Sequence, residues 1–236
     1  MLHRIKATAV ATILLTQPLL SQSAVESTDS LKNRILQLAR SYEGQGDPDQ
    51  SKQRTIEVLV QKLVEENPMP PIKDRLTTLA GVWKQVWGPY DYRNDDGGID
   101  PTLGIKEIYQ VVFAEGYYYN VAPLYPNEDT SREQIGLLRG EFKLDSADPN
   151  GLRVEFTKYP GVEPRPSGIA IWELAQLAEQ DRLINEITIV PTWIVRLFFG
   201  GGKLEEVYTD HDIRILYGTK AKKGSRRSIY IMSRVK

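Results

Sequence analysis

The segment Leu79–Trp87 reads LAGVWKQVW and opens an extended region after a long stretch of helical pattern. Its glycine, Gly81, has no Cβ, so the chain can turn sharply there or approach a neighbouring segment closely. The valines and tryptophans that follow are residue types enriched in strands. A first strand of this kind needs a partner, because an unpaired sheet edge templates aggregation. The final extended segment, Ser228–Val235 (SIYIMSRV), is the expected partner, so the first and last strands should be neighbours.

Short strands and frequent turns between these two segments are typical of an antiparallel β-barrel. Hairpins are expected around Glu115-Gly116 and around Asp148–Gly151, with one short helix within Trp172–Leu183. Two apolar segments, Ile187–Val190 and Trp193–Phe199, fit either a strand or a helix. The fold class expected for residues 76–236 is therefore mainly β, with one antiparallel barrel.

Helical spacing dominates the region before the barrel. Apolar residues recur at helical intervals through Leu31–Tyr42 and again through Ile56–Val64. Glycines end the first segment, and Asn67-Pro68 followed by two further prolines stops the second. Residues 29–67 are therefore expected to form an antiparallel helical pair that closes one end of the barrel.

Residues 1–24 have the three parts of a secretory signal: a basic start, a mostly apolar run over Ala7–Leu20, and a small-residue exit. The apolar run is shorter than the roughly 20 residues that a membrane span needs. We expect cleavage after Ser23 or Ala24 and export across a membrane. The alternative is that the segment is retained and holds the protein at the membrane.

Composition excludes several classes of site. Hydrophobic residues make up 41% of the 236 residues and charged residues 26%, as in an ordinary globular protein. The chain has no cysteine, so disulfides, zinc–thiolate sites and thiol nucleophiles are excluded. The formal net charge of −1 gives no overall attraction to nucleic acid, and no nucleic-acid partner is expected.

The polar segment Tyr208–Arg214 (YTDHDIR) is the strongest candidate for catalysis by composition. Asp210 and Asp212 are two carboxylates, and His211 between them is one of the two histidines of the chain. Strand alternation would, however, place the two aspartates on one face and the histidine on the other. A turn between two strands explains the same residues with fewer assumptions. We therefore expect a turn, and no catalytic residue is assigned.

Metal and phosphate sites are not indicated either. The acidic segment Asp91–Asp100 does not follow the spacing of a calcium-binding EF-hand loop, and no two histidines stand at ligand spacing. The triplet Gly200–Gly202 lacks the lysine and the remaining motif of a phosphate-binding loop. No metal and no cofactor is expected.

Aromatic residues lie on consecutive predicted strands. A barrel wide enough for one ligand would be lined by such rings, with a few polar groups to orient the ligand. Gln85 and Gln110 are polar groups of this kind. The alternative is that the rings fill a closed core, and the residues alone leave both interpretations open. The candidate ligand-binding residues are Trp83, Gln85, Trp87, Tyr109, Phe113 and Tyr118.

Four ordered pieces of the chain, from about Leu31 to Arg234, resemble the plastid lipid-associated protein family. Its members are also called fibrillins or plastoglobulins, and the family extends into cyanobacteria. The pieces are EENP at Glu65–Pro68, LAGVW at Leu79–Trp83, IYQVV…YYYNV within Ile108–Val121, and VYTDHDIRILYG at Val207–Gly218 with a closing IYIMSR.

The resemblance implies a lipocalin-like barrel without enzymatic activity. It would bind a lipid or isoprenoid compound, such as a quinone, a carotenoid or an acyl lipid, and associate with photosynthetic membranes or their lipid globules. Together with the export expected from residues 1–24, this indicates a peripheral membrane protein of a thylakoid lumen or periplasm. By analogy with lipocalins, Arg234 would lie over Trp83 in a cation–π contact. Two alternatives remain: a coat protein with a filled barrel, or an enzyme that uses the aspartates and His211. The residues expected to play structural roles are Gly81, Asp210, Asp212, Arg214 and Arg234.

Basic residues gather at the expected turn between the last two strands. No acidic residue follows Asp212, so this end of the chain carries a local positive charge. Such a tip is expected to meet anionic membrane lipids, with about 1 kcal/mol of attraction for each basic residue near the surface. The alternative is a solvated tip whose charges keep an edge from pairing. The basic residues are Lys220, Lys222, Lys223, Arg226 and Arg227.

Overall fold

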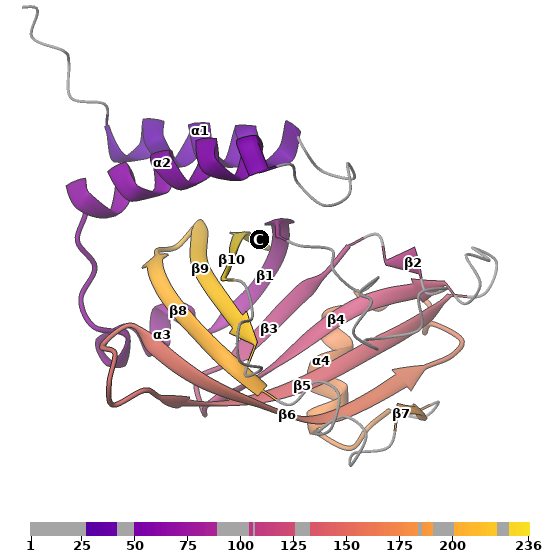
Figure 1. The fold of residues 1–236 in the computed structure, drawn as a ribbon. Helices are drawn as coiled ribbons and strands as arrows, with labels where there is room; N and C mark the ends of the chain where they lie inside the picture. The colour runs from indigo at the N-terminus through magenta and orange to yellow at the C-terminus, as the bar shows by residue number, and fades with distance from the viewer. Residues whose placement is uncertain are drawn as a thin grey trace, which may run out of the picture.

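A computed structural model describes residues 27–41, 50–88, 104–105, 107–125, 133–183, 186–190, 201–220 and 227–236. Within these ranges the protein is mainly β, with antiparallel strands in one sheet and a few helices (Figure 1). The expected secretory signal, the acidic segment Asp91–Asp100, the apolar segment Trp193–Phe199 and most of the basic tip lie outside the described residues.

The strand pairings run in an unbroken circuit. In the order β1, β3, β4, β5, β6, β8, β9 and β10, each strand pairs with the next, and β10 pairs back onto β1. β2 adds to β4, and β7 adds to β6. The strands are β1 (Gly81–Trp87), β2 (Gly104–Ile105), β3 (Tyr109–Phe113), β4 (Tyr117–Tyr125), β5 (Gln134–Leu144), β6 (Gly151–Val162), β7 (Glu186–Val190), β8 (Gly201–Thr209), β9 (Ile213–Lys220) and β10 (Ser228–Arg234).

The expected partnership of the first and last strands is confirmed. β1 pairs with β10 so that Trp83 stands opposite Arg234. The two expected hairpins are also present: β3 pairs with β4, and β5 pairs with β6. Gly116, in the first hairpin turn, has a φ of +98°, a conformation that residues with a Cβ adopt only with strain. The segment Ile187–Val190, which fits a strand or a helix by pattern, lies in β7.

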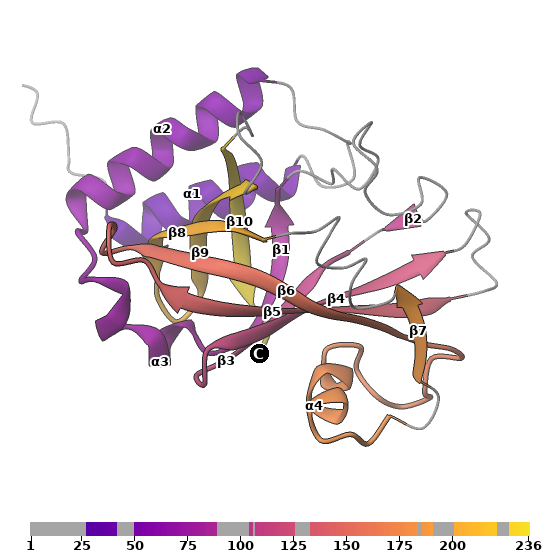
Figure 2. The ribbon, with the colours of Figure 1, turned by 60° about the horizontal axis from the view of Figure 1, so that its bottom comes forward.

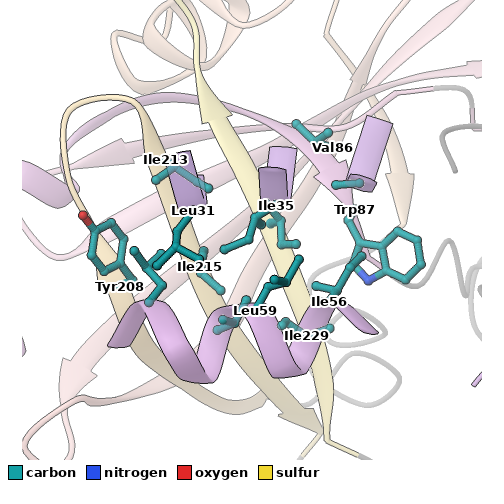
Figure 3. Close-up of a cluster of buried hydrophobic side chains, with 14 residues drawn as sticks. Leu31, Ile35, Ile56, Leu59, Val86, Trp87, Tyr208, Ile213, Ile215 and Ile229 are labelled. Carbon is teal, nitrogen blue, oxygen red and sulfur yellow. The ribbon is translucent and has the colours of Figure 1, made fainter. Parts of the chain in front are cut away.

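Two helices, α1 (Thr28–Ser41) and α2 (Gln50–Glu66), cover the outer face of β1, β8, β9 and β10 (Figure 1). Leu31 of α1 lies by Ile213 and Ile215 of β9, and Ile56 of α2 lies by Trp87 and Ile229 (Figure 3). The helical pair is as expected, but its place is not: it lies on a face of the sheet and does not close an end. The reason is alternation along β9, because Ile213 and Ile215 both face outward and must be covered.

A different segment closes one end of the inner face. The short 3₁₀ helix η1 (Ile72–Asp74) and the helical turn α3 (Leu76–Leu79) lead directly into β1. Ile72 and Leu79 are buried in the same cluster as Trp83. The cluster also contains residues of β5, β6, β9 and β10, such as Leu152 and Leu216. Strands that are distant in the circuit thus share one core, and we call the face that bears this cluster the inner face.

The remaining outer face is covered by α4 (Glu173–Glu179), the short helix that the sequence predicts. It packs against outward residues of β3, β4, β5 and β6, and Figure 2 shows it beside this part of the sheet. Its Leu174 and Ala175 are buried against Tyr119 and Val121. Among the described residues, every helix is too short or too polar to cross a membrane.

Candidate functional site

The inner face is completely filled around Trp83. This side chain is 0% exposed, and its Nε1 donates a hydrogen bond to the carbonyl oxygen of Leu79 over 2.9 Å. The expected cation–π contact is present: the guanidinium carbon of Arg234 lies 4.1 Å from the centroid of the Trp83 ring. The same guanidinium donates to the carbonyl oxygens of Ala80 at 3.0 Å and Thr78 at 2.6 Å. Arg234 therefore ties the start of β1 to the end of β10.

Gly81 fits this arrangement for two reasons. Its φ of +137° is strained for any residue with a Cβ. A Cβ at this position would also collide with the guanidinium of Arg234. The sequence prediction of a close approach at Gly81 is therefore explained by its partner, the arginine of the last strand.

A buried ion pair lies next to the filled end. Arg214 of β9 is 1% exposed and Glu206 of β8 is 0% exposed. Nε of Arg214 contacts Oε1 and Oε2 of Glu206 at 3.2 and 3.0 Å, and its Nη2 also donates to Oε1. A buried charge needs a partner of this quality, since removing either side chain leaves the other charged group without compensation.

Arg75, between η1 and α3, anchors the end segment to this pair. Its Nη2 donates to the carbonyl oxygen of Glu206 at 2.5 Å and to Oδ1 of Asn150 at 3.0 Å, and its Nε donates to the carbonyl oxygen of Pro70. Burial lowers the pKa of this guanidinium, and the positive charge of Arg214 acts in the same direction, although Glu206 opposes both. The closed end thus concentrates positive charge around one carboxylate.

Two amides continue the polar network along the inner face. Nη1 of Arg214 donates to Oε1 of Gln110 in β3, and Nε2 of Gln110 donates to Oδ1 of Asn120 in β4 at 2.9 Å. A third amide, Gln85 of β1, lies two residues beyond Trp83 on the same face and is 3% exposed. Its Nε2 is buried and has no hydrogen-bond partner among the described residues.

Beyond these amides the inner face becomes accessible. Asn120, Ala122, Phe156, Leu204 and Tyr230 all keep partial exposure there, in contrast to Trp83 and its neighbours. Their inward orientation follows from pairing, because Asn120 stands opposite Gln110 and alternate residues share a face. All of these side chains except that of Asn120 are aromatic or aliphatic. The inner face is thus closed at one end and accessible, largely apolar, at the other.

The candidate ligand-binding residues do not share one interior. Trp83, Gln85 and Tyr118 lie on the inner face, whereas Tyr109 and Phe113 face outward beneath α4. Tyr109 packs on Trp172 with 5.0 Å between ring centroids. The reason is again alternation, since Gln110 and Val112 take the inward positions of β3.

Trp87 also lies outside the interior in which it was expected from the sequence. A bulge between Gln85 and Trp87 interrupts the pairing of β1 with β10. The extra residue shifts the alternation, so that Val86 and Trp87 both join the cluster beneath α1 and α2 (Figure 3).

The turn interpretation of the polar segment after β8 is confirmed. Oδ1 of Asp210 accepts the backbone N–H groups of Asp212 and Ile213 at 2.8 and 3.0 Å, which closes the turn into β9. Its Oδ2 accepts from Nζ of Lys32 in α1 at 2.9 Å and from the Tyr208 hydroxyl at 3.1 Å. Burial alone would raise the pKa of Asp210, but the hydrogen bonds from Lys32 and the two backbone amides lower it. Asp210 therefore fastens α1 to the sheet.

Arg227 is the one residue of the basic tip whose side chain is described. Its Nη2 donates to Oε2 of Glu205 at 2.8 Å, and its guanidinium carbon lies 3.5 Å from the ring centroid of Tyr217. This side chain is held along the sheet. In the part of the chain that the structure describes, no three histidine, aspartate or glutamate side chains are grouped closely enough to hold a metal ion.

Sequence reasoning missed Glu206, Arg75 and Asn120. Glu206 had a signal: in strand β8 it is two residues beyond Leu204 and therefore shares the face of an apolar residue. A charged residue at such a position needs a buried partner, and Arg214 is the nearest candidate along the hairpin. Arg75 and Asn120 carried no comparable signal.

No protein-family model, no curated protein and no solved structure matches this chain. The resemblance to the plastid lipid-associated family consequently stays a prediction.

Proposed function

We propose that the protein is a non-enzymatic binder of one apolar molecule, held on the inner face of a lipocalin-like barrel. The observation that carries the proposal is the contrast along the inner face. It is sealed around Trp83, whereas Phe156, Leu204 and Tyr230 remain partly exposed. An enclosed apolar surface with a few convergent polar groups is the usual form of a small-molecule site.

The circuit of strand pairings supports the barrel. Each of eight antiparallel strands has a neighbour on both sides, which leaves no edge in the circuit. Barrels of this size hold one small ligand or are filled by side chains. The apolar lining favours a lipid or an isoprenoid compound, because burial of hydrocarbon is worth about 25 cal/mol per Å².

A dye that fluoresces in apolar surroundings tests the proposal directly. N-phenyl-1-naphthylamine should bind the purified protein with a saturable rise in fluorescence. Ala122 faces inward at the accessible end, so Ala122→Trp should fill the space and abolish binding. Ala147 lies in the exposed turn before β6, and Ala147→Trp is the matched control that should bind normally.

Mass spectrometry of the protein under native conditions, with extraction of any bound lipid, gives the second readout. A co-purifying apolar molecule lost from Ala122→Trp supports the carrier. Absence of both dye binding and a bound molecule would favour the rival function, a structural coat protein with a filled barrel. Two glycines support that rival, since Gly140 and Gly218 lie directly against the rings of Tyr118 and Tyr230.

We also propose that the basic tip brings the protein to an anionic membrane. Arg227 is occupied by Glu205 and Tyr217, so the attraction is assigned to Lys220, Lys222, Lys223 and Arg226. Replacing these four by serine should abolish sedimentation with vesicles rich in anionic lipid, and added salt should do the same to the unmodified protein. Arg227→Gln is the matched control and should retain most of the binding. If binding survives all four replacements, docking through the tip is wrong.

Export remains part of the proposal, motivated by the three-part pattern of residues 1–24. N-terminal sequencing of the protein from its native cell should find a start near Ala24 or Val25. Recovery of intact Met1 at a membrane would instead support the retained anchor.

A further inference from the structure

The polar residues of the inner face form a chain in which each hydrogen bond fixes the next. Arg214 is held by both carboxylate oxygens of Glu206 and donates to Gln110. A guanidinium has donors and no acceptor, so the atom of Gln110 that faces it must be the carbonyl oxygen Oε1. The amide nitrogen of Gln110 then points the other way and donates to Asn120.

Asn120 is the last residue of this hydrogen-bonded chain, and the orientation of its amide follows from that of Gln110. Because its Oδ1 accepts from Gln110, its NH₂ group is left to present two N–H donors. None of the described residues accepts a hydrogen bond from this group. Asn120 is partly exposed on the inner face, so these donors lie at the accessible part of the candidate site.

Gln85 supplies a further donor on the same face. Its Nε2 is buried and unpaired within the described part of the chain. The amide lies beside Tyr230 and Gly88, where a Cβ added to Gly88 would come within 2.9 Å of Nε2. A buried N–H without an acceptor costs free energy, and an acceptor brought by a ligand would recover it.

We infer that the inner face selects an apolar molecule that carries a carbonyl oxygen, such as a ketone, an ester or a quinone. The inference rests on the proposed function and narrows its ligand class. A carbonyl oxygen only accepts, so it satisfies an amide N–H and brings no donor that needs a partner. A hydroxyl would bring its own O–H, and a hydrocarbon would leave the amide N–H groups unpaired.

Displacement of N-phenyl-1-naphthylamine by three matched compounds tests this selection: nonane, nonan-2-one and nonan-2-ol. The quantity to compare between variants is the dissociation constant of the ketone divided by that of the alkane. The two compounds differ in the free energy of transfer out of water, and this difference is the same for every variant, so it cancels in the comparison. Asn120→Asp keeps the oxygen that accepts from Gln110 and replaces the NH₂ donor by an acceptor. The ratio should rise about 3- to 10-fold in this variant, the loss of one neutral hydrogen bond.

Gln85→Met gives a second test that has a different signature. It keeps the shape of the side chain and removes the buried donor, so the empty protein should unfold at a higher temperature while its preference for the ketone falls. A purely structural role for Gln85 predicts the opposite change in stability. Val58→Met exchanges one apolar side chain for another at an exposed position of α2, away from the inner face, and should leave the ratio unchanged.

The outcomes separate the two proposals. If the dye does not bind, the proposed function fails and the inference fails with it. If the dye and nonane bind but the ratio stays within twofold in both Asn120→Asp and Gln85→Met, the ligand class is wrong and the binding function stands. An alcohol-over-alkane ratio that rises as much as the ketone-over-alkane ratio in both variants also overturns the carbonyl selection.

Discussion

Replacing Trp83 by alanine should remove more stability than any other single apolar substitution on the inner face. Trp→Ala changes in a core cost about 3–5 kcal/mol, through lost burial and the cavity that remains. Trp83 is 0% exposed, which puts it at the upper part of that range. The total includes the hydrogen bond to Leu79, about 1 kcal/mol, and the contact with Arg234, about 0.5–2 kcal/mol. For a chain of this length the melting temperature should fall by roughly 6–20 °C.

Urea denaturation followed by circular dichroism measures this loss without relying on tryptophan fluorescence. Trp83→Phe keeps an aromatic face under Arg234 and loses the indole N–H, so it should cost about 1–2 kcal/mol. Trp172→Ala is the matched control: Trp172 is only partly buried, and its removal should cost less than half as much as that of Trp83. A loss below about 1 kcal/mol for Trp83→Ala would refute the reasoning, because changes of that size are typical of surface positions.

Three further predictions concern the residues around this core. Gly81→Ala should destabilise by about 1–3 kcal/mol in thermal unfolding, and Arg234→Met should not restore it fully, because the positive φ remains strained after the collision is removed. Glu206→Ala leaves Arg214 buried without its counter-charge and should cost about 3–5 kcal/mol in urea, whereas replacing both residues by methionine should recover most of that loss. The pKa of Asp210 is lowered in the folded protein, so its contribution is present above the ordinary aspartate pKa of about 4 and is lost as the pH falls through the lower folded value. The difference in urea midpoint between Asp210→Asn and the unmodified protein should therefore be largest near pH 7 and shrink as the pH is lowered below about 4.

The hairpins, the helical pair and the turn at Asp210 could be predicted from the sequence, because turn residues and hydrophobic periodicity are properties of short segments. The contact of Arg234 with Trp83 was expected by analogy with lipocalins, and Arg234 was the arginine to choose because the first and last strands were expected to be neighbours. The positions of Trp87 and Tyr109 were not, because both depend on which residue of a strand faces inward. The bulge after Gln85 changes which residues of β1 face inward, and no residue in LAGVWKQVW predicts a bulge at that position.

The inward orientation of Arg214 in β9 likewise decides which residues it contacts. From the sequence, Arg214 was assigned a structural role as part of a closing motif. In the structure this residue forms a buried ion pair with Glu206. Yet its Nη1 also donates to Gln110, so the arginine sets the orientation of two amides, Gln110 and Asn120. Replacing Arg214 and Glu206 together by apolar residues would preserve a packed core and free Gln110 to rotate. Asn120 would then no longer be held with its NH₂ group at the accessible end. If the proposed ligand class is correct, a stable variant without this buried cation should still bind hydrocarbons and should lose the part of the carbonyl preference that Asn120 supplies.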